Sequence, residues 1–179
     1  MGDSDSLEGV RERSIDCALV KTAASLCWCP ELEMNTPTDA AAPDFSLVRF
    51  ALHGGAGDLA PGAGPQPEHR AALERIAASA KALLMAGASA LDAVEHAVLL
   101  LEECPLFNAG IGGVLTREGL PELDAAIQNG QDRACGAVTG VMRSQSPIRL
   151  ARAVMERSPH VFFSGTGAEQ LGRELGLLL

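Results

Sequence analysis

The residues whose types and spacing best suit a functional site lie in one loop, 101–113, whose sequence is LEECPLFNAGIGG. An apolar helical pattern leads into this loop. Pro105 ends it, because proline has no N–H and disfavours helical backbone in the preceding residue. An asparagine and three glycines follow within 108–113, which indicates positive φ angles or close packing. The carbonyls of such a loop need partners, and a bound cation is one. An ordinary helix C-cap and turn is the alternative interpretation.

A second candidate site follows an alternating apolar pattern over 47–52, which predicts a strand. The pattern ends at His53, and a glycine turn comes next, formed by Gly54, Gly55, Ala56 and Gly57. His53 at a strand end could serve as a general base, and a structural, hydrogen-bonding histidine is the other interpretation. The turn formally matches the dinucleotide fingerprint. No helical pattern begins at Ala60, however, so nucleotide binding is not expected.

The rest of the sequence supplies no complete catalytic group. Gly-x-Ser-x-Gly is absent, and no pair of histidines has the i, i+4 spacing of helical metal ligands. Asp124 lies within an apolar strand pattern, where a half-buried carboxylate needs a partner such as Arg133 or Arg143. Four other acidic residues lie on one predicted helix, and most of their side chains are expected to face solvent. They are Asp92, Glu95, Glu102 and Glu103.

The elements that would position these residues alternate between helical and strand patterns. Ser89 is predicted to cap the helix that leads into the loop, and Asn129-Gly130 predicts the turn of an antiparallel hairpin. Thr166 and Glu169 have the spacing of a capping box. Beyond the glycine turn we predict a helix over 68–85 and a second helix from 90 to the loop. Strands are predicted over 120–128 and 134–142. A helix over 147–157, capped by Ser146, a buried strand over 161–163 and a last helix follow. This order indicates a layered α/β or α+β domain, and we take α+β as the expected class.

Charge and composition limit the partners of the chain. Its 179 residues suffice for one domain with a core, and its net charge of −9 argues against nucleic acid. Residues 1–46 hold nine acidic and three basic residues, and we expect a disordered N-terminal extension there, with the domain over 47–179. The lone Cys27-x-Cys29 pair lacks the further ligands of a metal site. No disulfide framework, membrane span or secretory signal is recognisable, so the cytoplasm is the expected location.

Several motifs, taken in order, resemble the isoaspartyl peptidase/L-asparaginase family, the plant-type asparaginases among the N-terminal nucleophile hydrolases. The most specific are HGGAG at 53–57 and PLFNAGIG at 105–112. The others are LDAV at 91–94, ELDA at 122–125, CGAV at 135–138 and SPHV at 158–161. The resemblance covers about residues 47–176 and leaves 1–46 without a counterpart.

This resemblance implies an αββα sandwich of which only the α-subunit half is present. Family members are made as one chain that cleaves itself. The cut exposes a Thr whose hydroxyl attacks the substrate amide while its freed α-amine acts as base. The resemblance puts that Thr and the substrate-binding residues downstream of this chain, so no catalytic residue is expected within it. The implied substrates are small molecules, isoaspartyl (β-aspartyl) dipeptides and L-asparagine. The implied partner is a β subunit in an (αβ)2 assembly.

The resemblance also implies supporting roles for residues of this chain. Asn108 matches the asparagine beside the nucleophile. The glycine loop near the scissile peptide is matched by His53, Gly54, Gly55 and Gly57. A structural sodium ion is implied, which would organise the loop and would not act as a Lewis acid; no organic cofactor is implied. Six carbonyls suit such a hard cation, and the matching ones belong to Leu101, Glu102, Cys104, Phe107, Ala109 and Ile111.

Two other interpretations stay open. One is a relative of the glycosylasparaginases or taspases, which the FNAG sequence at 107–110 argues against. The other is a catalytically inactive, truncated fragment that acts only by binding, if at all. An isolated half-domain would leave an apolar sheet face uncovered, and such a face favours association.

Overall fold

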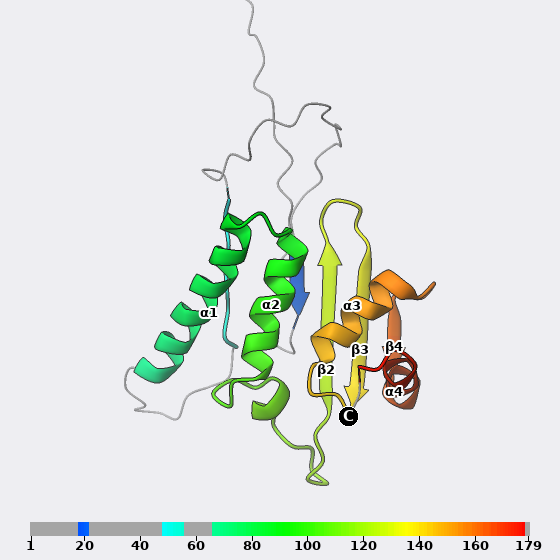
Figure 1. The fold of residues 1–179 in the computed structure, drawn as a ribbon. Helices are drawn as coiled ribbons and strands as arrows, with labels where there is room; N and C mark the ends of the chain where they lie inside the picture. The colour runs from blue at the N-terminus through cyan, green and yellow to red at the C-terminus, as the bar shows by residue number, and fades with distance from the viewer. Residues whose placement is uncertain (1–17, 22–47, 56–65, 178–179) are drawn as a thin grey trace, which may run out of the picture.

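The computed structural model describes residues 18–21, 48–55 and 66–177. A small sheet lies behind a layer of helices (Figure 1). In chain order the described elements are β1 (Ala18–Lys21), α1 (Pro67–Met85), α2 (Ala90–Glu102), a 3-10 turn (Gly110–Gly112), β2 (Leu123–Asn129), β3 (Cys135–Val141), α3 (Pro147–Arg157), β4 (Phe162–Ser164) and α4 (Gly165–Glu174). The predicted α+β class and the predicted helices are confirmed, with bounds within a few residues of those expected.

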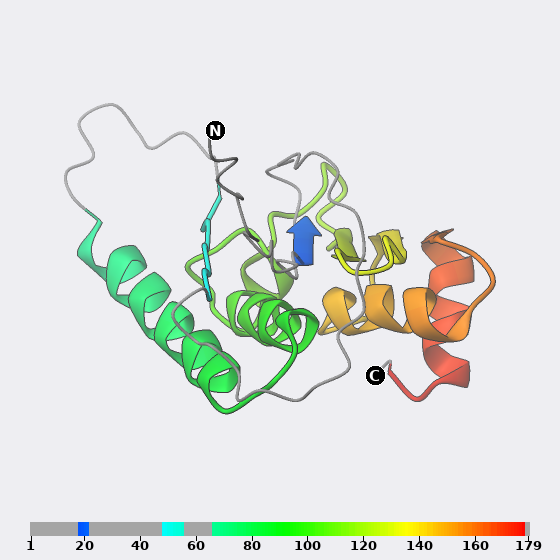
Figure 2. The same cartoon turned by 90° about the horizontal axis from the view of Figure 1, so that it is seen from above.

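The described strands form one sheet in the order β1-β2-β3-β4. β2 and β3 form the predicted antiparallel hairpin, β1 adds antiparallel to the outer edge of β2, and β4 runs parallel to β3. Viewed from above, α2 and α3 lie along the same side of the sheet, and α1 lies beyond α2 (Figure 2). One face of the sheet is therefore covered by this chain's own helices.

The main core lies between the sheet and these helices. Alternate residues of the hairpin, such as Ala125, Ile127 and Val138, are at most 2% exposed and pack against α3. The alternation arises because successive side chains of a strand point to opposite faces. At Gly136 the contact is between backbones, since a Cβ atom there would lie 2.1 Å from the carbonyl oxygen of Ala151. Glycine at this position is what allows α3 to lie so close to β3.

A second cluster joins α1 to α2 and anchors the 101–113 loop. Its buried members are Ala72, Ile76, Ala80, Ala97, Leu101 and Phe107. Small alanines on both helices let the two axes approach closely. Phe50 and Leu52, from the segment before the glycine turn, pack against the same cluster. The chain ahead of His53 is thus fixed against α1 and α2.

Two strand predictions need correction. The alternating segment 47–52 was expected to be a strand, but residues 48–55 have no regular secondary structure. Alternation predicts which side chains face inward, whereas a strand also needs a neighbouring backbone to pair with. The strand near 161–163 does form as β4, but it is not buried, with Val161 and Phe162 59% and 55% exposed. Among the described strands it lies at the edge of the sheet, where helices cover only one face.

The local capping predictions succeed only in part. Ser89 caps α2 as expected, with its Oγ accepting from the N–H of Asp92 at 3.1 Å. Ser146 makes no side-chain cap on α3, and the capping box of Thr166 and Glu169 does not form. Glu169 instead accepts a hydrogen bond from the N–H of Met142 at 3.1 Å. In each failed case the capping side chain has a tertiary partner or the helix begins at a different residue.

The hairpin turn also differs in detail. The connection runs over 130–134 and is closed by a hydrogen bond from the N–H of Asn129 to the carbonyl of Ala134 at 2.8 Å. The residue with a positive φ is Arg133, at 62°, and not Gly130. Asn129 and Asp132 side chains accept from backbone N–H groups inside this turn, which stabilises a longer connection than Asn-Gly alone predicts.

The N-terminal segment was expected to lack regular structure. Ala18–Lys21 instead forms β1 and pairs with residues 126–129 of β2. The expectation is therefore wrong for these four residues. The rest of 1–46, including Cys27 and Cys29, lies outside the described residues, as does Gly57.

The backbone contact at Gly136 gives a test of the helix–sheet packing. Gly136→Ala should lower the free energy of unfolding by about 2 kcal/mol or more, because the methyl group meets the backbone of α3. Gly167→Ala is the matched control, since its Cβ atom would find only Phe163 at 3.9 Å, and alanine favours a helix. Urea unfolding followed by circular dichroism measures both. Equal effects of the two substitutions would contradict the packing described.

Candidate functional site

The 101–113 loop winds tightly where α2 ends. The N–H of Cys104 donates to the carbonyl of Leu101 at 3.2 Å, and the N–H of Phe107 donates to the carbonyl of Cys104 at 3.3 Å. The N–H of Ala109 continues the series to the carbonyl of Phe107 at 2.8 Å. Phe107 is only 4% exposed. The loop is therefore held by its own backbone and by one aromatic side chain inserted into the core.

Glycine allows the carbonyls of this loop to crowd together. A Cβ atom on Gly112 would lie 2.2 Å from the carbonyl oxygen of Phe107, 3.0 Å from that of Pro105 and 3.1 Å from that of Cys104. No side chain fits at such distances. Glycine is therefore required at position 112 by the approach of three carbonyls, and the sequence signal of clustered glycines has a direct structural cause.

Gly110 makes a similar approach at the start of the 3-10 turn. Its φ is +51°, in the left-handed region that favours glycine, and a Cβ atom there would lie 2.2 Å from the carbonyl oxygen of Glu102. The end of α2 and the glycine turn of the loop are thus in backbone contact.

These contacts involve several of the six carbonyls that the family resemblance assigns to a sodium ion. Of the four carbonyls that approach Gly110 and Gly112, those of Glu102, Cys104 and Phe107 belong to that set, and that of Pro105 does not. The other three predicted carbonyls are those of Leu101, Ala109 and Ile111; the first two each accept a backbone N–H within the loop. Carbonyl oxygens are of the ligand type that a hard cation such as sodium takes. The donor chemistry of the residues present therefore fits such an ion.

Asn108 closes the loop from its exposed side. Its Oδ1 accepts a hydrogen bond from the N–H of Val114 at 2.9 Å. This bond spans six residues and fixes the position of the side chain on the surface of the loop. The rest of the Asn108 side chain is exposed to solvent.

The glycine turn lies against the loop. A Cβ atom on Gly54 would lie 2.8 Å from the Cε1 atom of Phe107, so the backbone of the turn rests on the ring that anchors the loop. His53 is exposed, and its Nδ1 accepts from the N–H of Gly55 at 3.2 Å. Gly55 has φ +125°. The two most specific sequence motifs are thus in contact, with His53 stabilising the turn.

Glu102 is a buried group that the sequence did not reveal. It was expected on a solvated helix face, yet it is 1% exposed. Its Oε1 accepts from the N–H of Ile148 at 3.0 Å, and its Oε2 accepts from the Oγ of Ser146 at 3.1 Å. Burial raises the pKa of this carboxyl to about 8, against these hydrogen bonds, which lower it. Glu102 therefore caps α3 in the place predicted for Ser146.

The other acidic residues of α2 also face α3. Arg152 of α3 forms ion pairs with Glu95 and, at 2.7 Å, with Asp92, and its Nε donates to Glu156 at 2.7 Å. Burial alone would lower the pKa of the guanidinium, but its three carboxylate partners raise it. The pKa of Asp92 is lowered by Ser89 and by Arg152. The expected solvated face of α2 is in part an interface, and of the four residues predicted there Glu103 is exposed.

Asp124 has a partner, but not the one expected. Its Oδ1 accepts from the Oγ1 of Thr139 at 2.6 Å and from the N–H of Gly140 at 2.9 Å. The strand register shifts beside it, and Gly140 has φ +62°. Asp124 is exposed and stabilises an irregularity of the hairpin, so the predicted pairing with Arg133 or Arg143 is wrong.

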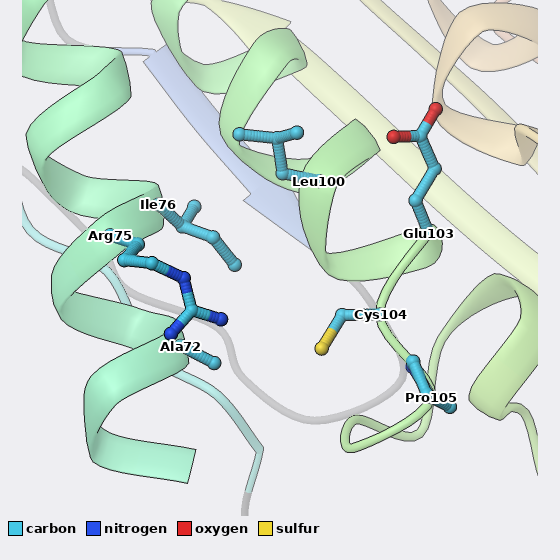
Figure 3. A pocket seen from close by; sticks show the side chains of 7 residues that line it. All are labelled: Ala72, Arg75, Ile76, Leu100, Glu103, Cys104 and Pro105. Carbon is cyan, nitrogen blue, oxygen red and sulfur yellow. The ribbon is translucent and has the colours of Figure 1, made fainter. Parts of the chain in front are cut away.

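A shallow pocket of about 380 Å³ lies beside the loop, between α1 and the end of α2. Arg75 of α1 and the thiol of Cys104 point toward the space between these segments, whereas Glu103 points away from it (Figure 3). The remaining lining residues are Ala72, Ile76, Leu100 and Pro105. His53, Gly54 and Asn108 do not line it, so the pocket shares with the candidate site only the loop residues Glu103, Cys104 and Pro105.

The layered α+β fold and its glycine-rich loop can now be compared with known proteins. The sequence model of the asparaginase family (Asparaginase_2) matches residues 46–179. The chain belongs to this family, whose members have the N-terminal nucleophile hydrolase fold. None of the described helices has the length and apolarity needed to cross a bilayer.

Similar proteins carry names of this family. The isoaspartyl peptidase of Salmonella typhimurium is 48% identical over 134 residues, which cover 72% of this chain and 42% of the relative. The isoaspartyl peptidase/L-asparaginase of Rattus norvegicus is 43% identical, covering 78% and 41%. The plant-type L-asparaginase of Pyrococcus abyssi is 42% identical, covering 73% and 42%. The chain thus spans about two-fifths of the length of these relatives.

The buried carboxyl gives a test of how the loop is held. Glu102→Ala should lower the free energy of unfolding by about 3 kcal/mol, because it leaves the N–H of Ile148 unpaired beside a cavity. Glu102→Gln should cost less than half as much, since a neutral amide keeps an acceptor there. Glu103→Ala, at the exposed neighbour, should change stability by less than about 0.5 kcal/mol. Chemical denaturation at pH 7 compares them; similar losses for Ala at 102 and 103 would contradict the capping role.

Proposed function

We propose that this chain is the N-terminal, α-subunit portion of an isoaspartyl peptidase/L-asparaginase. It would form one half of an αββα sandwich and line one side of the active site. The activity would be hydrolysis of β-aspartyl dipeptides and L-asparagine, the substrates that the relatives' names indicate or the resemblance implies. The observation that carries the proposal is the contact of Gly54 with Phe107, which brings the two most specific family motifs to one place.

In this mechanism the residues of this chain hold the reacting groups in position, and none of them attacks the substrate amide. The nucleophile would be a Thr at the start of a β subunit, freed by self-cleavage, whose amine takes the proton of its hydroxyl. Asn108 is exposed and fixed by Val114, so it can support that Thr without rearrangement. The turn of His53, Gly54 and Gly55 would present backbone N–H groups near the scissile peptide. Gly57, which lies outside the described residues, belongs to the same proposed turn.

A sodium ion in the 101–113 loop is part of the proposal. The carbonyls of Glu102, Cys104 and Phe107 would hold it, with those of Leu101, Ala109 and Ile111. When bound, it supplies positive charge that offsets the repulsion among crowded carbonyl dipoles. Its effect would be to fix the loop and with it Asn108. No organic cofactor is needed for amide hydrolysis by a Thr nucleophile.

The partner would be a β subunit, with the whole assembly an (αβ)2 heterotetramer located in the cytoplasm. The open face of the sheet supports a partner, because the described helices cover only the other face (Figure 2). Val161, just before β4, and Phe162 within it are exposed apolar side chains, which a second layer would cover.

The activity is tested by reconstitution. The chain alone should release no aspartate from β-aspartyl-leucine or asparagine. Co-expression with the C-terminal portion of the Salmonella relative, starting at its nucleophile Thr, should produce release. An Asn108→Ala chain co-expressed in the same way should be at least tenfold less active. Arg117→Ala, at another exposed position nearby, should leave the rate unchanged.

The outcomes separate the readings of this chain. Release by the chain alone would contradict a nucleophile in another subunit. Release only from glycosylated asparagine would favour a glycosylasparaginase-like enzyme. A complex that forms but hydrolyses none of the substrates would favour an inactive fragment.

Sodium binding is tested by thermal unfolding. Replacing choline chloride by sodium chloride at equal ionic strength should raise the Tm of the chain, because a ligand of the folded state stabilises it. Gly112→Ala should abolish the rise, since its methyl group occupies the space between the carbonyls. Gly119→Ala strains a residue with φ +77° but has no atom near its Cβ, so it should lower Tm yet keep the sodium response. A rise that persists in Gly112→Ala would contradict the site.

A further inference from the structure

A short two-stranded finger, residues 114–121, connects the glycine-rich loop to β2. Its two sides meet in an antiparallel bridge between Leu115 and Pro121. The N–H of Thr116 donates to the carbonyl of Leu120 at 2.8 Å, and the N–H of Leu120 donates to the Oγ1 of Thr116 at 3.3 Å. The finger is thus closed by its own hydrogen bonds, and it projects beyond the end of the sheet in the yellow-green segment that leads into β2 (Figure 1).

Large apolar side chains are exposed on both faces of this finger. Val114, Leu115 and Leu120 are 68%, 62% and 48% exposed. Opposite residues of an antiparallel pair share a face and successive residues alternate, so Leu115 and Pro121 lie on one face and Leu120 lies on the other. Two paired strands have little stability of their own in water, and apolar surface gathered in one place marks a contact site. The pattern therefore suits a partner that packs against both faces.

The finger is also bound to the candidate site. The N–H of Val114 donates to the Oδ1 of Asn108 at 2.9 Å. Because Val114 is the first residue of the finger, a partner that packs against the finger would also hold the hydrogen bond that positions Asn108. With Oδ1 engaged in this way, the Nδ2 group of the same amide is left as a hydrogen-bond donor. A partner on the finger would therefore lie beside this donor.

The family match indicates which partner this is. The finger lies inside the matched region 46–179, so it belongs to the family domain. The chain spans only about two-fifths of the length of its relatives. The rest of such a protein has to pack against surfaces of the part present here, and apolar side chains that are exposed in this part are the ones it would bury.

We propose that the β subunit packs against both faces of the finger at residues 114–116 and 120–121, and that this contact holds the subunit beside Asn108. The tip of the finger carries Arg117 and Glu118, which are exposed and stay in water, because burying unpaired charges is costly. The identity of the partner rests on the proposed function.

Serine substitutions on each face test the contact in the full chain, tagged and co-expressed with the C-terminal portion of the Salmonella relative. Leu115→Ser and Leu120→Ser should each reduce the amount of that portion that copurifies by at least about fivefold. Met85→Ser is the matched control, since Met85 is a large apolar residue, 46% exposed, at the end of α1. It should leave the amount within about twofold of wild type. All three side chains are exposed, so the Tm of each chain alone should stay near the wild-type value.

The outcomes separate the contact at the finger from the activity. A wild-type complex that releases no aspartate would contradict the proposed activity, while losses confined to Leu115→Ser and Leu120→Ser would still support the contact. Full copurification of either variant, or an equal loss in Met85→Ser, would overturn the contact and leave the activity standing. Absence of a wild-type complex would overturn both. Light scattering of the chain alone tests the other occupant: a dimer that either leucine substitution dissociates would mean that a second copy, and not the β subunit, binds the finger.

Discussion

Glu102 connects the three parts of the chain on which the candidate site depends. It is the last residue of α2, its carboxyl group caps the first turn of α3, and its backbone carbonyl contacts Gly110 of the loop. Burying a carboxyl away from water disfavours its charged form, and this burial raises the pKa of Glu102 to about 8. Glu102 thus fixes the end of α2, where the 101–113 loop begins, against the start of α3.

Backbone contact at glycine is the second constraint that recurs in this fold. Gly54 lies on Phe107, Gly112 lies among loop carbonyls, and Gly136 lies on α3. Each allows two backbones, or a backbone and a ring, to approach more closely than any side chain would permit. Alanines at 72, 80 and 97 have the same effect between α1 and α2. A site made of main-chain carbonyls and N–H groups depends on such proximity more than on particular side chains.

Asn108 and the glycine turn are both fixed near one buried ring, that of Phe107. The chain belongs to the asparaginase family and spans about two-fifths of the length of its relatives. The Arg152 network links α2 to α3 within the helix layer.

Much of the local structure was readable from the sequence. The apolar periodicity of α1, the cap at Ser89, the stop at Pro105 and the hairpin all depend on neighbours within a few residues. The clustered glycines also marked places where backbones approach closely, at Gly54, Gly110 and Gly112. These signals act at short range, where the chain's own stereochemistry decides.

The sequence alone determined the family, the order of the elements and the residues of the two motifs. Only the tertiary structure decided that Gly54 meets Phe107, that Glu102 and not Ser146 caps α3, and that Asp124 pairs with Thr139. It also decided that residues 48–55 form no strand while Ala18–Lys21 does. Each of these depends on a partner distant in the sequence, and neither periodicity nor composition specifies which distant groups meet.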